Sequence, residues 1–226
     1  MSEHNADLTA VVEGHEVFNW ERSARLTLLL WIALWGVPPA RAQQPDSVLY
    51  VLLPQSRFDV QTGKSGLFSF AGHDHLIRAH AVSGRIVHFP GAPARSRVEI
   101  VVPSERLEVL TPPDTEEIRK VTAAMRRDVL DVPNHPEIRF VSSAVTPIPD
   151  GLRIRGDLTL VGATREVTVD VRLTERADTL WAAGTFAVKQ SHFGIRPYRG
   201  GPAGIIRVAD RVTFRFATVA LRAGSS

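Results

Sequence analysis

The chain has 226 residues, of which 44% are hydrophobic and 23% charged, and it contains no cysteine. The lack of cysteine excludes a disulfide framework, a Cys-based zinc site and a cysteine nucleophile. The formal net charge is +3 at pH 7 and the basic residues are spread along the chain, which favours weak attraction to anionic surfaces and gives little support to nucleic-acid binding.

The N-terminal part of the chain is typical of an export signal. Two arginines precede an apolar stretch over residues 26–37, and an Ala-Arg-Ala sequence follows and ends at Ala42. A basic segment, a short apolar segment and a small-residue cleavage site in this order predict a cleavable signal peptide; the alternative is a buried helix of a small extension. The stretch is shorter than the roughly 20 apolar residues that a membrane span needs. We therefore expect an extension with a signal over residues 1–42, and one domain over residues 43–226 that is periplasmic and has no stable membrane anchor.

Apolar and polar residues alternate with period two along most of this domain. The alternation is clearest over residues 152–160 and 167–173, with Gly162 in the turn between them. This pattern predicts a hairpin with one buried and one wet face, in which Gly162 has a positive φ. Less regular runs of the same kind occur at 48–60, 65–71, 78–89, 96–102, 137–146, 180–190 and 205–221. Short strands divided by turn residues predict an antiparallel sandwich or barrel.

One segment has helical spacing instead. Asp114 can cap a helix together with Glu117, and apolar residues follow at helical spacing until two prolines end the pattern. The apolar positions are Ile118, Val121, Met125 and Val129. The sequence therefore predicts one amphipathic helix over about residues 114–130, which either flanks a barrel end or covers exposed sheet.

Two histidines stand out after an apolar run that contains Phe68 and Phe70. His73 and His75 would point to the same face of a strand, because strand side chains alternate sides. They could be structural, donate hydrogen bonds to a ligand head group, or bind a metal with further ligands brought in by the fold. Those further ligands would come from His80, His135 or His192. No G-x-S-x-G or H-E-x-x-H motif is present, so the sequence predicts no enzyme.

Seven short motifs occur in a fixed order within residues 48–221. They are Ser56-Arg57-Phe58, Val-Ser-Gly-Arg-Ile at 82–86, Met-Arg-Arg-Asp-Val-Leu-Asp-Val at 125–132, His-Pro-Glu-Ile-Arg-Phe at 135–140, Gly-Asp-Leu-Thr-Leu-Val-Gly-Ala-Thr at 156–164, Ser-His-Phe-Gly-Ile at 191–195 and Val-Ala-Asp-Arg-Val at 208–212. In this order they resemble the YceI family of exported, polyisoprenoid-binding proteins. The resemblance implies an all-β fold. The fold would be an extended antiparallel β-barrel of eight strands, similar to that of the lipocalins. Its apolar interior would hold an isoprenoid lipid, such as a polyprenyl phosphate or a quinone, without a cofactor.

The ligand-binding residues that we expect on this basis are aromatic and aliphatic side chains of the barrel interior, with histidines for polar contacts. They are Phe68, Phe70, His73, His75, Ile138, Phe140, Leu160, Phe186, His192 and Phe193. Each apolar one could instead be ordinary core packing. Two other functions stay open, namely a metal- or haem-associated enzyme or redox accessory centred on His73 and His75, and a secreted adhesion or stress protein with a fully packed barrel. The sequence does not decide whether the barrel forms a homodimer.

Overall fold

The computed structural model describes residues 47–65, 75–111, 115–197, 199–200 and 206–224. The predicted signal peptide, its cleavage site after Ala42 and nearly all of the predicted strand at 65–71 lie outside the described residues. Within the described part of the chain, no helix is long and apolar enough to cross a membrane.

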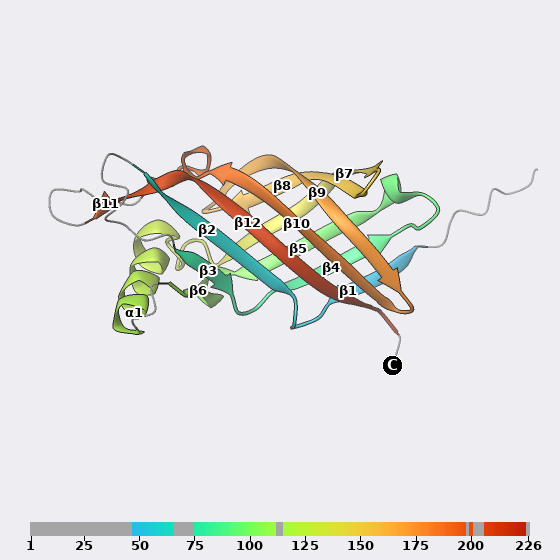
Figure 1. Ribbon diagram of the computed structural model, residues 1–226, viewed down its shortest axis with the longest axis horizontal. Helices are drawn as coiled ribbons and strands as arrows, with labels where there is room; N and C mark the ends of the chain where they lie inside the picture. Colours follow the sequence, from blue (N-terminus) through green and yellow to red (C-terminus); the bar gives the residue numbers. More distant parts are fainter. Residues whose placement is uncertain (1–46, 66–74, 112–114, 198, 201–205, 225–226) are drawn as a thin grey trace, which may run out of the picture. The chain divides into compact units, whose positions relative to one another are not determined.

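Eight antiparallel strands form a closed barrel, as the sequence predicted (Figure 1). In ring order they are β1 (Val48–Leu52), β4 (Ser83–His88), β5 (Arg97–Pro103), β7 (Glu137–Ile148), β8 (Gly151–Leu160), β9 (Ala163–Arg176), β10 (Thr179–Lys189) and β12 (Ile206–Arg222). Pairing between β1 and β12, with Val51 opposite Leu221, closes the ring. Closure leaves these strands without free edges and encloses the inward side chains.

A second group of strands extends the sheet beyond the ring. β2 (Arg57–Ser65), β3 (Leu76–Ala79) and β6 (Leu107–Val109) follow one another from β12, and the two-residue β11 (Arg199–Gly200) also pairs with β12. The long strand β12 pairs with β1 near its end and with β2 along the rest of its length.

The runs at 48–60 and 78–89, each predicted as one strand, are therefore two strands each, and that prediction was wrong. The first break falls at Pro54, which has no N–H to give to a sheet. Beside Pro54, the Ser56 hydroxyl takes the place of backbone pairing with β12. It accepts a hydrogen bond from the Val219 N–H and donates one to the Val219 carbonyl, both at 3.1 Å. The second break lies between β3 and β4, where the His80 N–H donates to the Arg106 carbonyl at 2.9 Å.

The predicted amphipathic helix is present as α1 (Thr115–Ala124) and one wide turn over Met125–Val129. The segment ends at Val129, and Asp131, which has a φ of 46°, turns the chain before the prolines. Asp114 lies outside the described residues. Three short helical turns complete the described elements, at Pro93–Arg95, Ser104–Arg106 and Gln190–Phe193.

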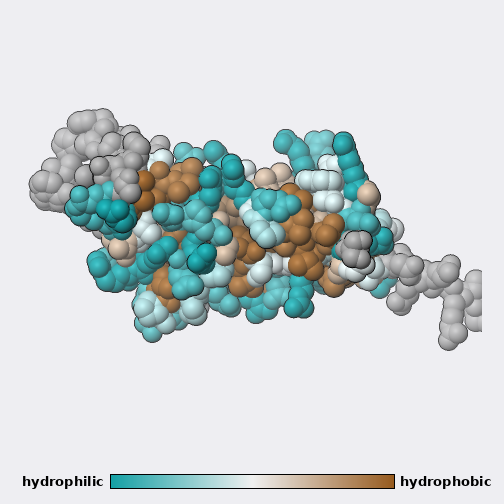
Figure 2. Space-filling model, turned by 90° about the horizontal axis from the view of Figure 1, so that it is seen from below, coloured by the Kyte–Doolittle hydropathy of each residue, from teal (hydrophilic) through white to brown (hydrophobic). Residues whose placement is uncertain are grey.

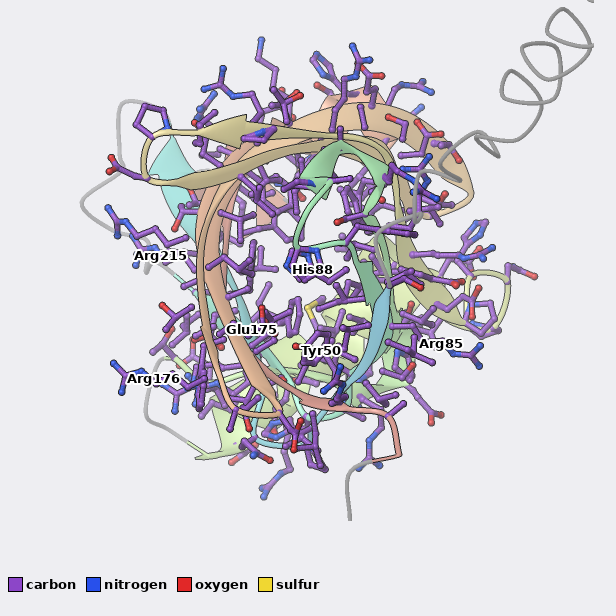
Figure 3. The ribbon with its side chains drawn as sticks, turned by 90° about the vertical axis from the view of Figure 1, so that its right-hand side faces the viewer. Tyr50, Arg85, His88, Glu175, Arg176 and Arg215 are labelled. Atoms are coloured by element: carbon purple, nitrogen blue, oxygen red, sulfur yellow. The ribbon has the colours of Figure 1, made fainter. Side chains whose placement is uncertain are left out.

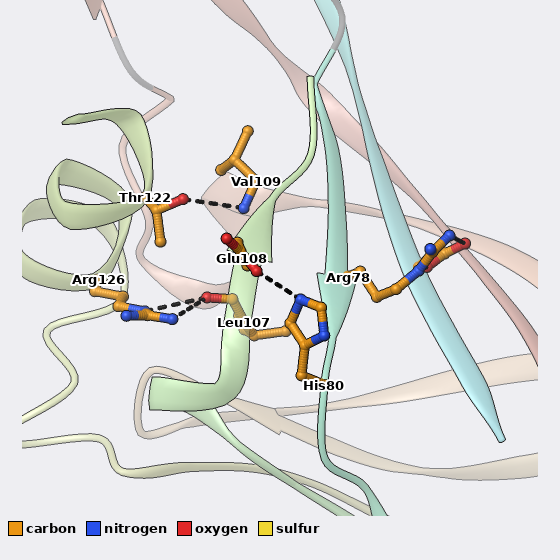
Figure 4. A network of polar contacts seen from close by, with 8 residues as sticks. Arg78, His80, Leu107, Glu108, Val109, Thr122 and Arg126 are labelled. Atoms are coloured by element: carbon orange, nitrogen blue, oxygen red, sulfur yellow. Dashed lines mark hydrogen bonds and ion pairs between the residues drawn. The ribbon is translucent and has the colours of Figure 1, made fainter. Parts of the chain in front are cut away.

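The helix covers the exposed edge of β6 (Figure 4). The Val109 N–H and the Leu107 carbonyl point away from β3, and side chains of the helical segment satisfy both. The Thr122 hydroxyl accepts from the Val109 N–H at 3.1 Å, and the Arg126 guanidinium donates to the Leu107 carbonyl at 2.8 Å. The helix thus replaces a missing neighbouring strand, which protects an edge that would otherwise be free to pair.

Candidate ligand-binding cavity

An apolar cavity lies inside the barrel. The space open to the centre of a water-sized sphere is about 150 Å³, and all empty space, including any open to solvent, is about 1280 Å³. The lining is apolar apart from Asp59, His88, Ser96, Arg215 and Thr218. This cavity is contrary to the hypothesis of a fully packed barrel, because a packed core has few voids larger than a water molecule.

Aromatic rings form much of the cavity wall. Phe58 stacks on Phe216 with ring centroids 5.8 Å apart, and Phe186 stacks on Phe214 at 4.9 Å. Phe214 and Phe216 are two residues apart on β12 and so share its inner face. Stacked rings make flat apolar walls suited to a slender hydrocarbon chain.

Two glycines lie directly beneath aromatic rings of the cavity wall. A Cβ on Gly156 would lie 2.6 Å from the Phe140 ring, and a Cβ on Gly184 would lie 2.7 Å from the Phe216 ring. Both distances are far below van der Waals contact, so each ring lies directly over glycine backbone.

One end of the cavity is polar (Figure 3). Tyr50 and His88 are buried inside the ring of strands and the partly exposed Glu175 points toward them, whereas Arg85, Arg176 and Arg215 lie on the outside. We call the cluster of Tyr50, His88, Ser96 and Glu175 the polar end.

Within the polar end, the His88 side chain is only 8% exposed. Its Nδ1 lies 3.3 Å from the Ser96 hydroxyl, and its Nε2 lies 3.8 Å from a carboxylate oxygen of Glu175. The Tyr50 hydroxyl donates a hydrogen bond to the same carboxylate. Burial, together with that hydrogen bond and the charge of Glu175, raises the pKa of Tyr50 to about 12. Tyr50 therefore stays neutral over the physiological range.

The sequence analysis missed the polar end. His88 comes two residues after the buried Ile86, and Glu175 comes two residues after Leu173, which lines the cavity. The period-two alternation, continued to the ends of these strands, would have placed both side chains on the inner face.

The structure places the predicted ligand-binding residues in four different settings. Ile138, Phe140 and Phe186 line the cavity. Leu160 and Phe193 are buried in the core cluster that includes Met125 and Leu130 below the helix, and they do not line the cavity. His192 is exposed, His75 is half-buried, and Phe68, Phe70 and His73 lie outside the described residues. Contact between any of these side chains and a ligand stays a prediction.

His75 has structural partners. Its Nδ1–H donates to the Thr111 carbonyl at 2.7 Å, and its backbone N–H donates to the Thr62 hydroxyl at 3.1 Å. His80 is paired with Glu108 at 2.7 Å (Figure 4). The described residues contain no group of three or more His, Asp or Glu side chains that could hold a metal ion. These contacts show that His75 has a structural role through its Nδ1 and backbone N–H; because His73 lies outside the described residues, the metal interpretation of the pair is not tested.

The YceI-like domain model matches residues 58–220 of the chain. BcnA of Burkholderia cenocepacia has a similar fold, with a TM-score of 0.59, 21% identity, and 73% of this chain and 95% of that chain covered. A polyisoprenoid binding domain from Saccharophagus degradans aligns with a TM-score of 0.54 at 11% identity, covering 78% of this chain and 99% of that one. A YCEI protein of Campylobacter jejuni aligns with a TM-score of 0.51 at 14% identity, covering 66% and 85%. Among curated proteins the sequence finds no match.

Proposed function

The chain belongs to the YceI-like domain family, and we propose that it is a non-catalytic periplasmic carrier that holds a long isoprenoid lipid in its barrel. The observation that carries this proposal is the apolar, aromatic-lined cavity inside a closed barrel. Burial of a hydrocarbon tail contributes about 25 cal/mol for each Å² removed from water, so such a cavity binds a long tail without strong polar contacts. The Saccharophagus degradans domain with the same fold is described as polyisoprenoid binding, which supports the choice of lipid.

The polar end favours an uncharged head group. Beside Tyr50, the Asp178 carboxylate is paired with the Arg222 guanidinium at 3.5 Å, and the partly exposed Glu175 carboxylate is bonded to the Tyr50 hydroxyl, so these three charged groups together are negative. A phosphate would be repelled, whereas a quinone carbonyl or a prenol hydroxyl can hydrogen-bond to the His88 ring. We therefore propose a neutral isoprenoid, with its head at the polar end and its tail along the aromatic wall.

Native mass spectrometry of protein purified from its own cell envelope tests both the carrier function and the neutral head group. We expect a bound lipid whose mass corresponds to a neutral isoprenoid. An Ala182→Phe variant should lose it, because Ala182 lines the cavity and the larger ring would fill the space that the tail needs.

The matched control is Ala183→Phe, which adds the same ring to the neighbouring, exposed position of β10. It should keep the lipid, and circular dichroism should show that both variants are folded. Wild-type protein without bound lipid, or equal lipid content in the two variants, would contradict the proposed carrier function. A bound polyprenyl phosphate would keep the carrier but contradict the neutral head group.

A further inference from the structure

Large apolar side chains gather on the outer face of β1, β10 and β12. Leu49 is 41% exposed, Val51 43% and Trp181 39%. Val51 lies opposite Leu221, and Trp181 lies opposite Val219, so the five side chains form one continuous surface, which we call the apolar face. Figure 2, which views the barrel from the side on which β1 lies, shows apolar atoms collected between hydrophilic ends.

Arginines border the apolar face. Arg172, Ala183, Ala217 and Arg57 form one cross-strand row over β9, β10, β12 and β2, so an arginine stands on each side of two small alanines. Arg176 and Arg215 also project outward from this side of the barrel (Figure 3).

Among the described residues, none of Arg57, Arg172, Arg176 and Arg215 has a carboxylate within ion-pair distance. Two of the nearby acidic side chains are engaged by other arginines, since Asp59 is bonded to Arg78 at 2.7 Å and Asp178 lies 3.5 Å from Arg222.

The opposite wall has a different pattern. There, on β5, β7, β8 and β9, three outward arginines are matched by acids across the strands, namely Arg139 with Glu99, Arg153 with Asp170 at 2.7 Å and Arg155 with Glu166 at 3.5 Å. Arginines without an acidic partner therefore gather around the side that also exposes Leu49, Val51 and Trp181. A partner that is both apolar and anionic would complement this combination of side chains.

We propose that the apolar face docks the barrel on an anionic lipid surface. Apolar side chains gain by entering the boundary between head groups and acyl chains, and tryptophan is favoured at that depth. Guanidinium groups form strong paired hydrogen bonds with phosphate. A protein partner or a second copy of the chain would have to supply the same pairing of an apolar centre with an acidic rim.

The docked side also borders a place where an outer groove and the inner cavity share lining residues. Pairing between β9 and β10 ends at Gly184 opposite Val171, and an outer groove of about 480 Å³ lies over this point. Val171 and Phe216 line both the groove and the inner cavity. The groove is also lined by three arginines and three aspartates, namely Arg57, Arg172, Arg215, Asp59, Asp150 and Asp170. Two of these aspartates form ion pairs with other arginines, Asp59 with Arg78 and Asp170 with Arg153. The docking proposal does not depend on what the cavity holds.

Co-sedimentation of the full chain with vesicles tests the docking. We expect binding to vesicles of mixed phosphatidylglycerol and phosphatidylcholine, weaker binding to phosphatidylcholine alone, and a decrease at high salt because ions screen the arginines. Val51→Asp should reduce the partition coefficient several-fold. Arg172→Ala should reduce it roughly fivefold, the effect of one basic residue near an anionic surface.

The matched control is Val141→Asp, because Val141 is also an outward strand residue, 38% exposed, but lies on β7 away from the apolar face. It should bind vesicles like wild type. Since all variants share residues 1–42, any contribution of that segment is common to them. Equal binding by Val51→Asp and Val141→Asp would overturn the proposal, as would the absence of vesicle binding by wild type. Self-association that only Val51→Asp removes, without vesicle binding, would overturn it in favour of a second copy.

Discussion

Tyr50 combines complete burial with a polar contact. The residue is 1% exposed and packs with Leu52, Leu180 and Ala220, while its hydroxyl reaches the Glu175 carboxylate at the polar end. An ionised phenol in this position would lose its hydration beside a negative carboxylate, so the fold strongly favours the neutral form. This preference links the stability of the barrel to pH.

We expect the free energy of unfolding to decrease at high pH because of Tyr50. Its pKa rises from 10.0 to about 12 on folding, so the folded state holds the proton more tightly. The stabilisation is complete below pH 10 and is lost as the pH rises through about 12; its size is on the order of 2 kcal/mol. Urea unfolding between pH 8 and pH 12 should show this loss in wild type and not in Tyr50→Phe. Equal pH dependence in the two proteins would contradict the assignment.

Alternation along the strands predicts which face a side chain occupies but not how far along the barrel it lies. It identified Phe140 and Phe186, which line the cavity, and in the same way Leu160 and Phe193, which lie below the helix. Position along the axis depends on the stagger of the strands, which no local pattern contains. The positive φ expected of Gly162 is confirmed at 71°, because a tight turn is a local feature.

At the scale of elements, the sequence predicted the main strands of the ring and the helix, and it missed where strands break. The breaks after β1 and after β3 occur where a strand changes partners, from the ring to the branch of β2, β3 and β6. A strand's partner is set by pairing with distant segments, so alternation continues across the break. The short strand β6 was missed for the same reason, since only the helix and β3 make it a strand.

The edge contact between helix and β6 should be worth a measurable part of the stability. Thr122→Val keeps the shape of the side chain but leaves the buried Val109 N–H without its acceptor. We expect a loss of about 1–3 kcal/mol in the free energy of unfolding, the cost of an unsatisfied buried polar group. Thr122→Ser keeps the hydroxyl and should recover most of that loss in denaturant titrations. If Thr122→Val were as stable as wild type, the hydrogen bond would not contribute as proposed.

The whole barrel has sides of different character, although each strand has the same alternation. Cross-strand ion pairs join β8 and β9, whereas β1, β10 and β12 expose apolar side chains bordered by arginines. Sequence alone showed the spread of basic charge but not this separation, because it arises when closure brings β1 beside β12. The polar end, the apolar face and the groove over Gly184 all depend on that closure.

The same closure gives a prediction about processing. In the described part of the chain, the first strand of the ring begins at Val48, downstream of the predicted cleavage after Ala42. We expect the exported protein to begin at Gln43, to be recovered from the periplasm, and to keep the full stability of the barrel. Mass spectrometry of its N-terminal peptide provides the measurement, with the cytoplasmic fraction as the control for unprocessed chain. An N-terminal peptide that still includes residues 26–37 would show that the apolar stretch is retained, and would contradict the cleavable signal.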